Sequence, residues 1–178
     1  DTRDAARSAA LAAEKSGAAV LITDLDAAST LAVADAVKLP VLNVGLANDA
    51  LREKDCRANL FHLLPSERMR TDALAQSLVA RKWSNVLVLT GPSADDAART
   101  ASAQASMKRY GIKVVATKSF RISADPGERD LANTLLLSGG GLSYDAVWVI
   151  DSDGEFARSL PYRTSLPRPV VGDAGLTA

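Results

Sequence analysis

The sequence predicts an α/β fold with two lobes, each built from a parallel sheet flanked by helices. Helical and extended signals alternate along all 178 residues, and 47% of them are apolar, which is enough for a sizeable core. Three strand segments contain the continuous apolar runs VLI, VLVL and VWVI, which are typical of parallel strands buried on both faces. The alternation restarts near residues 60–66, which indicates two sheets rather than one.

The first predicted lobe covers residues 1–64. An Ala-rich segment, residues 4–16, predicts a helix that ends before Gly17. A second helix is expected at residues 29–38, because Leu31, Ala34 and Val37 have helical spacing and Pro40 ends the segment. Strands are expected at residues 18–23 and 41–44. An extended connection between the lobes is expected near residues 61–66.

The second predicted lobe covers residues 65–178. Pro65 opens a helix that runs to about residue 82, with Ser66 as its N-cap. The further strands are expected at residues 85–90, 112–118, 146–151 and 169–172. The further helices are expected at residues 93–110, 127–138 and 154–160. The triple glycine 139–141 precedes a strand and is interpreted as a helix stop and turn.

Composition excludes several classes of function. The 21 Lys and Arg residues balance 21 Asp and Glu residues without a basic block, so the chain is not expected to bind nucleic acid. No apolar run approaches the ~18 residues of a membrane span, so direct membrane insertion is not expected. Phosphate-binding glycine motifs and the GxSxG elbow are absent, and no cofactor is expected.

Cys56 and His62 are the single cysteine and the single histidine of the chain. One cysteine cannot form a disulfide framework within the chain, and one histidine cannot form a His-rich zinc site. We interpret His62 as a hydrogen-bonded structural residue and Cys56 as an inert or half-buried thiol. An enzyme is therefore a minority interpretation.

Acidic side chains follow the predicted strands, where ligands of open parallel sheets bind. These residues are Asp24, Asp26, Asp95, Asp96, Asp151, Asp153 and Glu155. Two interpretations stay open: most of them cap helices, or the pairs Asp24/Asp26 and Asp151/Asp153 hold a hard cation such as calcium. No Lys or Arg occurs beside these two pairs, which favours a positively charged ligand.

Five segments carry a resemblance to a known family. They are residues 56–66 (CRANLFHLLPS), 72–78 (DALAQSL), Trp83, 161–164 (PYRT) and 167–176 (PRPVVGDAGL). The chain resembles type I periplasmic solute-binding proteins of the branched-chain amino acid receptor type. Within them it is most similar to the substrate-binding component of ABC transporters associated with pyrroloquinoline-quinone-dependent alcohol dehydrogenase systems.

The resemblance implies a periplasmic receptor whose two lobes close around a small ligand and whose partners are the membrane subunits of an ABC transporter. It also implies that the chain is a fragment of the full fold, in agreement with an opening at Asp1 without Met. The alternatives are a ligand-sensing regulatory domain of the same fold and an α/β enzyme.

The resemblance also places the ligand contacts. Hydroxyl groups that hold an amino acid carboxylate in relatives fall near Ala27, Ala28 and Ala47, and the acid that meets the ammonium group falls near Ala174. Each lost polar contact costs ~1–3 kcal/mol, so an ordinary amino acid is not the expected ligand. The candidate ligand-binding residues are Asp24, Asp26, Ala27, Ala28, Asn43, Gly45, Ala47, Gly91, Asp151, Ser152 and Asp173. The candidate metal ligands are Asp24, Asp26, Asp151 and Asp153.

Overall fold

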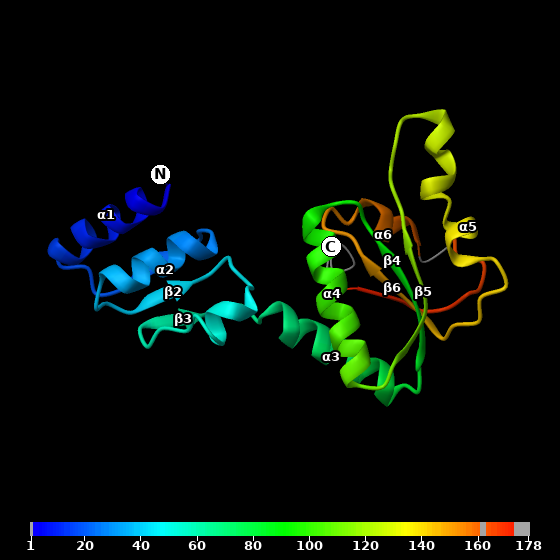
Figure 1. Cartoon of the computed structure of the whole chain (residues 1–178), viewed down its shortest axis with the longest axis horizontal. Coiled ribbons are helices and arrows are strands. Elements are labelled where there is room, and N and C mark those ends of the chain that lie inside the picture. The colour runs from blue at the N-terminus through cyan, green and yellow to red at the C-terminus, as the bar shows by residue number, and fades with distance from the viewer. Residues whose placement is uncertain (1, 161–162, 173–178) are drawn as a thin grey trace. The chain divides into compact units, whose positions relative to one another are not determined.

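The computed structural model describes residues 2–160 and 163–172, which form two compact units (Figure 1). Unit 1 is Asp1–Met69 and unit 2 is Arg70–Ala178, so the division falls inside helix α3, Glu67–Ala80. No helix in these residues is both long and apolar enough to cross a membrane.

Unit 1 holds a three-stranded parallel sheet in the order β1-β2-β3. Its elements are α1 (Thr2–Lys15), β1 (Leu21–Thr23), α2 (Ala27–Ala36), β2 (Val41–Asn43), the 3-10 helix η1 (Asp49–Arg52) and β3 (Leu60–His62). Strand β3 corrects the expectation of an extended connection, because Leu60–His62 pairs along its whole length with β2. The sheet therefore has one more strand than predicted.

Within unit 1, α1 and α2 cover the same face of this sheet. Leu21, Val41 and Leu60 share a core with α1 and α2, which both lie on that face. The neighbouring cross-strand row is Ile22, Leu42 and Phe61. Because side chains alternate along a strand, this row points to the opposite face, where Ile22 is 68% exposed and Phe61 50% exposed. The prediction that the VLI run is buried on both faces is therefore wrong.

Unit 2 holds a four-stranded parallel sheet in the order β5-β4-β6-β7. Its elements after α3 are β4 (Asn85–Thr90), α4 (Ala94–Arg109), β5 (Lys113–Ser119), η2 (Pro126–Ala132), α5 (Thr134–Ser138), β6 (Ala146–Ile150), α6 (Glu155–Ser159) and β7 (Val170–Val171). The predicted division of parallel strands between two sheets is thus confirmed.

Both faces of the second sheet are buried. On one face Val88 and Trp148 pack with residues of α3 and α4. On the other face Leu87 shares a core with Phe120 and Phe156, whose rings stack with centroids 3.9 Å apart. The VLVL and VWVI runs are therefore buried on both faces, as their lack of alternation predicts.

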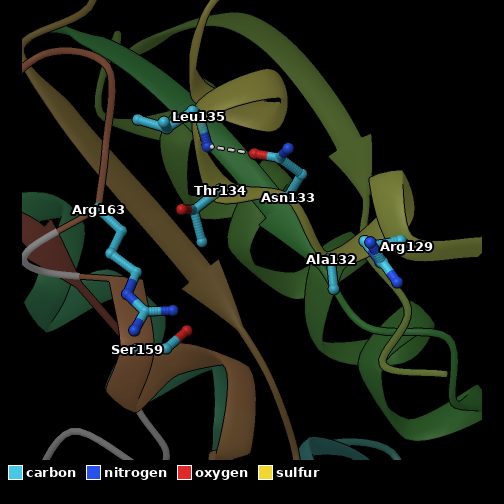
Figure 2. Close-up of a pocket in the computed structure, with 7 residues that line it drawn as sticks. All are labelled: Arg129, Ala132, Asn133, Thr134, Leu135, Ser159 and Arg163. Atoms are coloured by element: carbon cyan, nitrogen blue, oxygen red, sulfur yellow. Dashed lines mark hydrogen bonds between the residues drawn. The ribbon is translucent and has the colours of Figure 1, made fainter. Parts of the chain in front are cut away.

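The single helix predicted at residues 127–138 is two helices. Asn133 has extended backbone angles (φ −76°, ψ 103°) and accepts hydrogen bonds from the N–H groups of Leu135 and Leu136, so it ends η2 and caps α5. An open groove of about 530 Å³ lies beside this break, between η2, α5 and the end of α6 (Figure 2).

Candidate functional site

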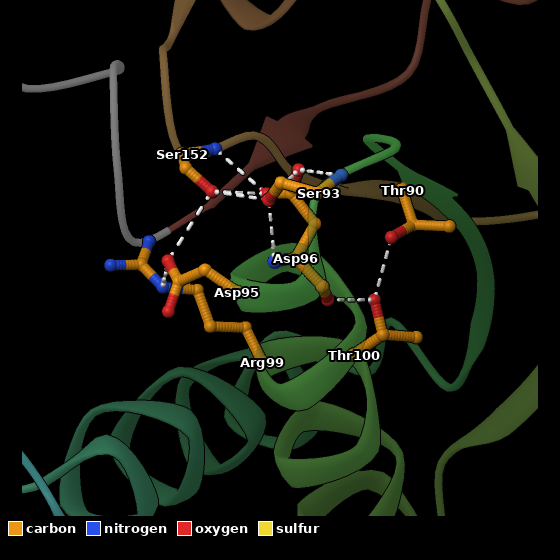
Figure 3. Close-up of polar contacts among 7 residues, drawn as sticks. All are labelled: Thr90, Ser93, Asp95, Asp96, Arg99, Thr100 and Ser152. Carbon is orange, nitrogen blue, oxygen red and sulfur yellow. Dashed lines mark hydrogen bonds and ion pairs between the residues drawn. The ribbon is translucent and has the colours of Figure 1, made fainter.

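The loops after β4 and β6 are joined by the carboxylate of Asp96 (Figure 3). Its Oδ1 accepts from the Ser152 backbone N–H at 2.8 Å and from the Ser152 hydroxyl at 2.5 Å. Its Oδ2 accepts from the backbone N–H and the hydroxyl of Ser93 at 3.1 and 2.7 Å, and Ser93 caps α4 in return. Four donors therefore hold one nearly buried carboxylate and fix both loops.

The surroundings of Asp96 favour its ionised form. Burial raises the pKa of this carboxyl, but the hydrogen bonds from Ser152 and Ser93 outweigh burial and the pKa lies below its usual value of 3.8. Gly91 is small because a Cβ there would lie 2.4 Å from Asp96 Oδ2. The structure thus gives Gly91 and Asp96 a role in shaping the loop.

Further polar contacts surround this carboxylate. Arg99 pairs with Asp95 at 3.0 Å, and the Thr100 hydroxyl lies 2.7 Å from that of Thr90 and 2.7 Å from the Asp96 carbonyl oxygen. Ser93, Asp95 and Ser152 are exposed, so a solute can reach these three groups of the cluster.

Of the three acidic residues that follow β6, Asp151 is nearly buried and accepts a hydrogen bond from the Ala157 N–H at 2.9 Å. It therefore stabilises the first turn of α6. Asp153 and Glu155 are exposed at the start of the same helix. Asp173 and Ala174 lie outside the described residues.

In unit 1, Asp26 caps α2. Its carboxylate accepts from the N–H and the hydroxyl of Ser29 at 3.0 and 2.8 Å, and these hydrogen bonds lower the pKa of Asp26. Ala27 and Ala28 form the first turn of α2, and Ala28 lines a groove with residues of α1. The capping interpretation is confirmed for Asp26, whereas in α4 Ser93 is the N-cap and Asp96 is the N3 residue of the capping box.

Asn43 is completely buried at the end of β2. Its Oδ1 accepts from the Leu46 N–H at 2.9 Å, and its Nδ2 donates to the Leu46 carbonyl at 2.7 Å and lies 2.9 Å from Nδ1 of His62. Burial lowers the pKa of His62, and the positive charge of Arg52 adds to the effect. Both side chains therefore hold the loop in shape, which confirms the structural interpretation of His62.

Asp24 and Gly45 meet across the ends of β1 and β2. A Cβ on Gly45 would lie 1.7 Å from Asp24 Oδ1, so the carboxylate occupies the space that a side chain would fill. Asp24 is exposed, in contrast to Asp151. Ala47 lies further along the same loop, and its carbonyl accepts from the Glu67 N–H at 3.0 Å.

Among the residues that it describes, the structure shows no cluster of metal-ligating side chains that would support the predicted metal site. Nowhere in residues 2–160 and 163–172 do three or more His, Cys, Asp or Glu side chains gather as ligands. Cys56 is a free, exposed thiol, which corrects the expectation of partial burial. Its neighbour Arg57 pairs with Asp35 at 2.5 Å.

Sequence reasoning missed Ser93 as part of the site. The signal was present, because Ser93 and Asp96 have the S-x-x-D spacing of a capping box. What the spacing could not show is that the same carboxylate also binds Ser152, which is 56 residues away in the sequence.

The comparisons agree with this architecture. Residues 1–136 match the family model described as periplasmic binding protein. The match covers all of unit 1 and more than half of unit 2. No curated protein matches the chain by sequence.

Solved structures share the fold. A solute-binding protein from R. palustris in complex with benzoate has a TM-score of 0.62 at 15% identity, over 98% of this chain and 49% of that one. An ABC transporter substrate-binding protein from Desulfitobacterium hafniense in complex with Leu has a TM-score of 0.68 at 13% identity, over 96% and 51%. A protein from Chromobacterium violaceum, described as a branched-chain amino acid ABC transporter, has a TM-score of 0.64 at 22% identity, over 93% and 51%.

The chain spans about half the length of these structures. Its two parallel sheets flanked by helices are part of the type I periplasmic binding fold. The family and these solved structures are binding proteins rather than enzymes. Because the family model matches three quarters of its residues, the chain belongs to the periplasmic binding protein family.

Proposed function

We propose that the chain is part of a periplasmic solute-binding protein that delivers a small ligand to the membrane subunits of an ABC transporter. The family match, which extends over both units, carries this proposal. Unit 1 then belongs to the first lobe and unit 2 supplies most of the second. Such a protein binds its solute without converting it.

The loops at the carboxyl ends of the strands are the proposed contacts. In unit 2, the exposed Ser152 hydroxyl and the exposed Asp95 carboxylate are held by the Asp96 network. In unit 1, the exposed Asp24 lies beside Gly45. Rigid support of this kind lowers the cost of ordering loops when a ligand binds.

The chemical class of the ligand has two candidates. The similar structures hold benzoate and Leu, which both carry a carboxylate, and this favours a small organic acid. Asp24 favours a cation instead, because its exposed carboxylate would repel an anion and attract a positively charged group. The alanines at positions 27, 28 and 47 have no hydroxyl group, so they cannot donate a side-chain hydrogen bond to an amino acid carboxylate.

A narrower proposal concerns the biological setting. The resemblance of residues 56–66 and 167–176 to transporters linked to pyrroloquinoline-quinone-dependent alcohol dehydrogenases supports a role beside alcohol oxidation. Transcript mapping tests it. The gene should be co-transcribed with such a dehydrogenase and with ABC transporter subunits, and a transcript with neither partner would contradict the link.

A thermal-shift screen tests the main proposal. The panel contains benzoate, leucine, other organic acids, alcohols, aldehydes, calcium and lanthanum. A ligand that binds the native state raises its stability by RT ln(1 + [L]/Kd), which is about 2.7 kcal/mol at a hundredfold excess over Kd. Stabilisation with the ligand recovered unchanged supports a receptor. Conversion of the ligand, or no stabilisation by any member of the panel, would refute it.

Asp24→Asn separates the two ligand classes, with Asp130→Asn on η2 as the matched exposed control. If the ligand is a cation, Asp24→Asn should weaken its binding while Asp130→Asn leaves it unchanged. If an organic acid binds at this loop, Asp24→Asn should strengthen its binding because the repulsive charge is removed.

A further inference from the structure

We propose that unit 2 carries a separate binding site for a small organic dianion, such as a dicarboxylate, in the groove between η2, α5 and the end of α6. None of the residues that line this groove is a candidate contact of the loops after β4 and β6. The inference is therefore independent of the solute site proposed above.

The groove is large enough for a small metabolite. Its volume is about 530 Å³, within the roughly 300–1,000 Å³ typical of ligand pockets. The break at Asn133 keeps it open, because the chain leaves η2 there before α5 begins. Its lining residues are Arg129, Ala132, Asn133, Thr134, Leu135, Ser159 and Arg163.

The charge of the lining is positive. Among the lining side chains that the structure describes, two are arginines and none is acidic. Arg121, by comparison, pairs with Glu128 at 3.2 Å, whereas neither Arg129 nor Arg163 forms an ion pair with any residue that the structure describes. A guanidinium binds a carboxylate through two parallel N–H···O bonds, so each arginine is suited to one anionic group.

The arrangement of these groups points to a ligand with two charged ends. In Figure 2, Arg163 extends toward Ser159 on one side of the groove, and Arg129 lies beside Ala132 on the other. Ala132 and Leu135 give the lining an apolar part, which suits a short hydrocarbon chain. Oδ1 of Asn133 is occupied by backbone N–H groups of α5, which leaves its amide nitrogen to donate to the ligand.

Calorimetry with succinate on the whole chain tests the site. The variants are Arg129→Gln and Arg163→Gln, and the control is Arg158→Gln, an exposed arginine of α6 that does not line the groove. Each groove variant should raise the succinate Kd about tenfold or more, because it removes one charge-assisted contact, and the control should match the unaltered chain.

Acetate and nuclear magnetic resonance complete the test. Acetate, with one carboxylate, should bind at least about tenfold more weakly than succinate. Succinate should shift the amide signals of residues 129–135 and 159–163. The proposal is overturned if the unaltered chain does not bind succinate, if both groove variants bind it as tightly as Arg158→Gln does, if acetate binds as tightly as succinate, or if the shifts fall in the loops after β4 and β6.

Discussion

The two sheets of this chain differ in how they are covered. In unit 2, α3 and α4 lie on one face and a cluster with Phe120 and Phe156 lies on the other, so β6 is buried along its whole length and β4 from its second residue onward. In unit 1, α1 and α2 share a single face and leave Ile22 and Phe61 exposed on the opposite one. A continuous apolar run thus indicates that both faces of a strand can be buried. The positions of the helices determine which of the two faces is buried.

The largest expected difference concerns core truncation. Leu87→Ala removes a completely buried side chain of unit 2 and should lower the free energy of unfolding by about 2–5 kcal/mol. Ile22→Ala removes a side chain that is 68% exposed in unit 1 and should cost less than about 1 kcal/mol.

Urea denaturation with two probes separates the units. Both tryptophans, Trp83 and Trp148, belong to unit 2, so their fluorescence reports that unit, whereas far-ultraviolet circular dichroism reports both. Equal losses for Leu87→Ala and Ile22→Ala would contradict the difference between the sheets.

Adding a methyl group to the two loop glycines should have unequal effects. Gly91→Ala places a Cβ 2.4 Å from Asp96 Oδ2, and four hydrogen bonds hold that carboxylate in place. The free energy of unfolding of this variant should therefore fall by about 1–3 kcal/mol. Gly45→Ala clashes with exposed Asp24, which is free to rotate into solvent, so its loss should be smaller. Thermal denaturation of both variants measures the order, and a larger loss for Gly45→Ala would reverse it.

Loss of the Asp96 carboxylate should lower the free energy of unfolding of unit 2 by about 1–3 kcal/mol, because the donors of Ser93 and Ser152 lose their acceptor. Asp95→Ala, which breaks an ion pair whose Asp95 side chain is 62% exposed, should cost less than about 1 kcal/mol. Tryptophan fluorescence in urea compares the two variants, and equal losses would contradict the role of Asp96.

The same carboxylate predicts a pH dependence. Because the pKa of Asp96 is lowered on folding, its stabilisation is fully present above the unfolded value of 3.8 and disappears as the pH falls through the lower folded value. The difference between the unaltered chain and Asp96→Ala should therefore stay constant from pH 7 to about 5 and shrink below 3.8. A difference that shrinks already between pH 7 and 5 would contradict this assignment.

The smallest expected effect concerns His62, the single histidine of the chain, which belongs to unit 1. Its pKa is lowered from 6.5, so the neutral ring is favoured in the folded state, where Nδ1 faces Asn43. The stability of unit 1 should thus be complete above pH 6.5 and decrease as the pH falls below it, because the unfolded chain takes up the proton first. The nuclear magnetic resonance titration of the His62 ring should show a midpoint below 6.5, and a midpoint above it would contradict this account.

The elements of unit 2 could be predicted most closely. The strand at residues 85–90 was predicted at its observed bounds, because VLVL is continuous and lies between a Trp-Ser turn and Gly91. The break at Asn133 could not be foreseen, since an Asn inside an apolar segment is compatible with a helix until its side chain caps the next one. The sequence does not identify Leu60–His62 as a strand, because its pairing with β2 joins segments that are distant in the sequence and is defined only in three dimensions.

The candidate site was predictable in its location and less so in its roles. The acidic residues do follow the strands, but the carboxylates of Asp26, Asp96 and Asp151 accept hydrogen bonds from backbone N–H groups. Sequence spacing alone does not separate such a carboxylate from an exposed one such as Asp24. For Asp96 and Asp151 the difference is burial, which depends on contacts between distant segments, whereas Asp26 is exposed and caps α2 through the neighbouring Ser29.

The proposed solute-binding role is tested most directly by a nuclear magnetic resonance titration of the isotope-labelled chain with the ligand that gives the largest thermal shift. The account predicts saturable shifts at residues 24–28, 45–47, 91–96 and 151–155, with the ligand unchanged at the end. Conversion of the ligand, or saturable shifts that avoid all four loops, would contradict it.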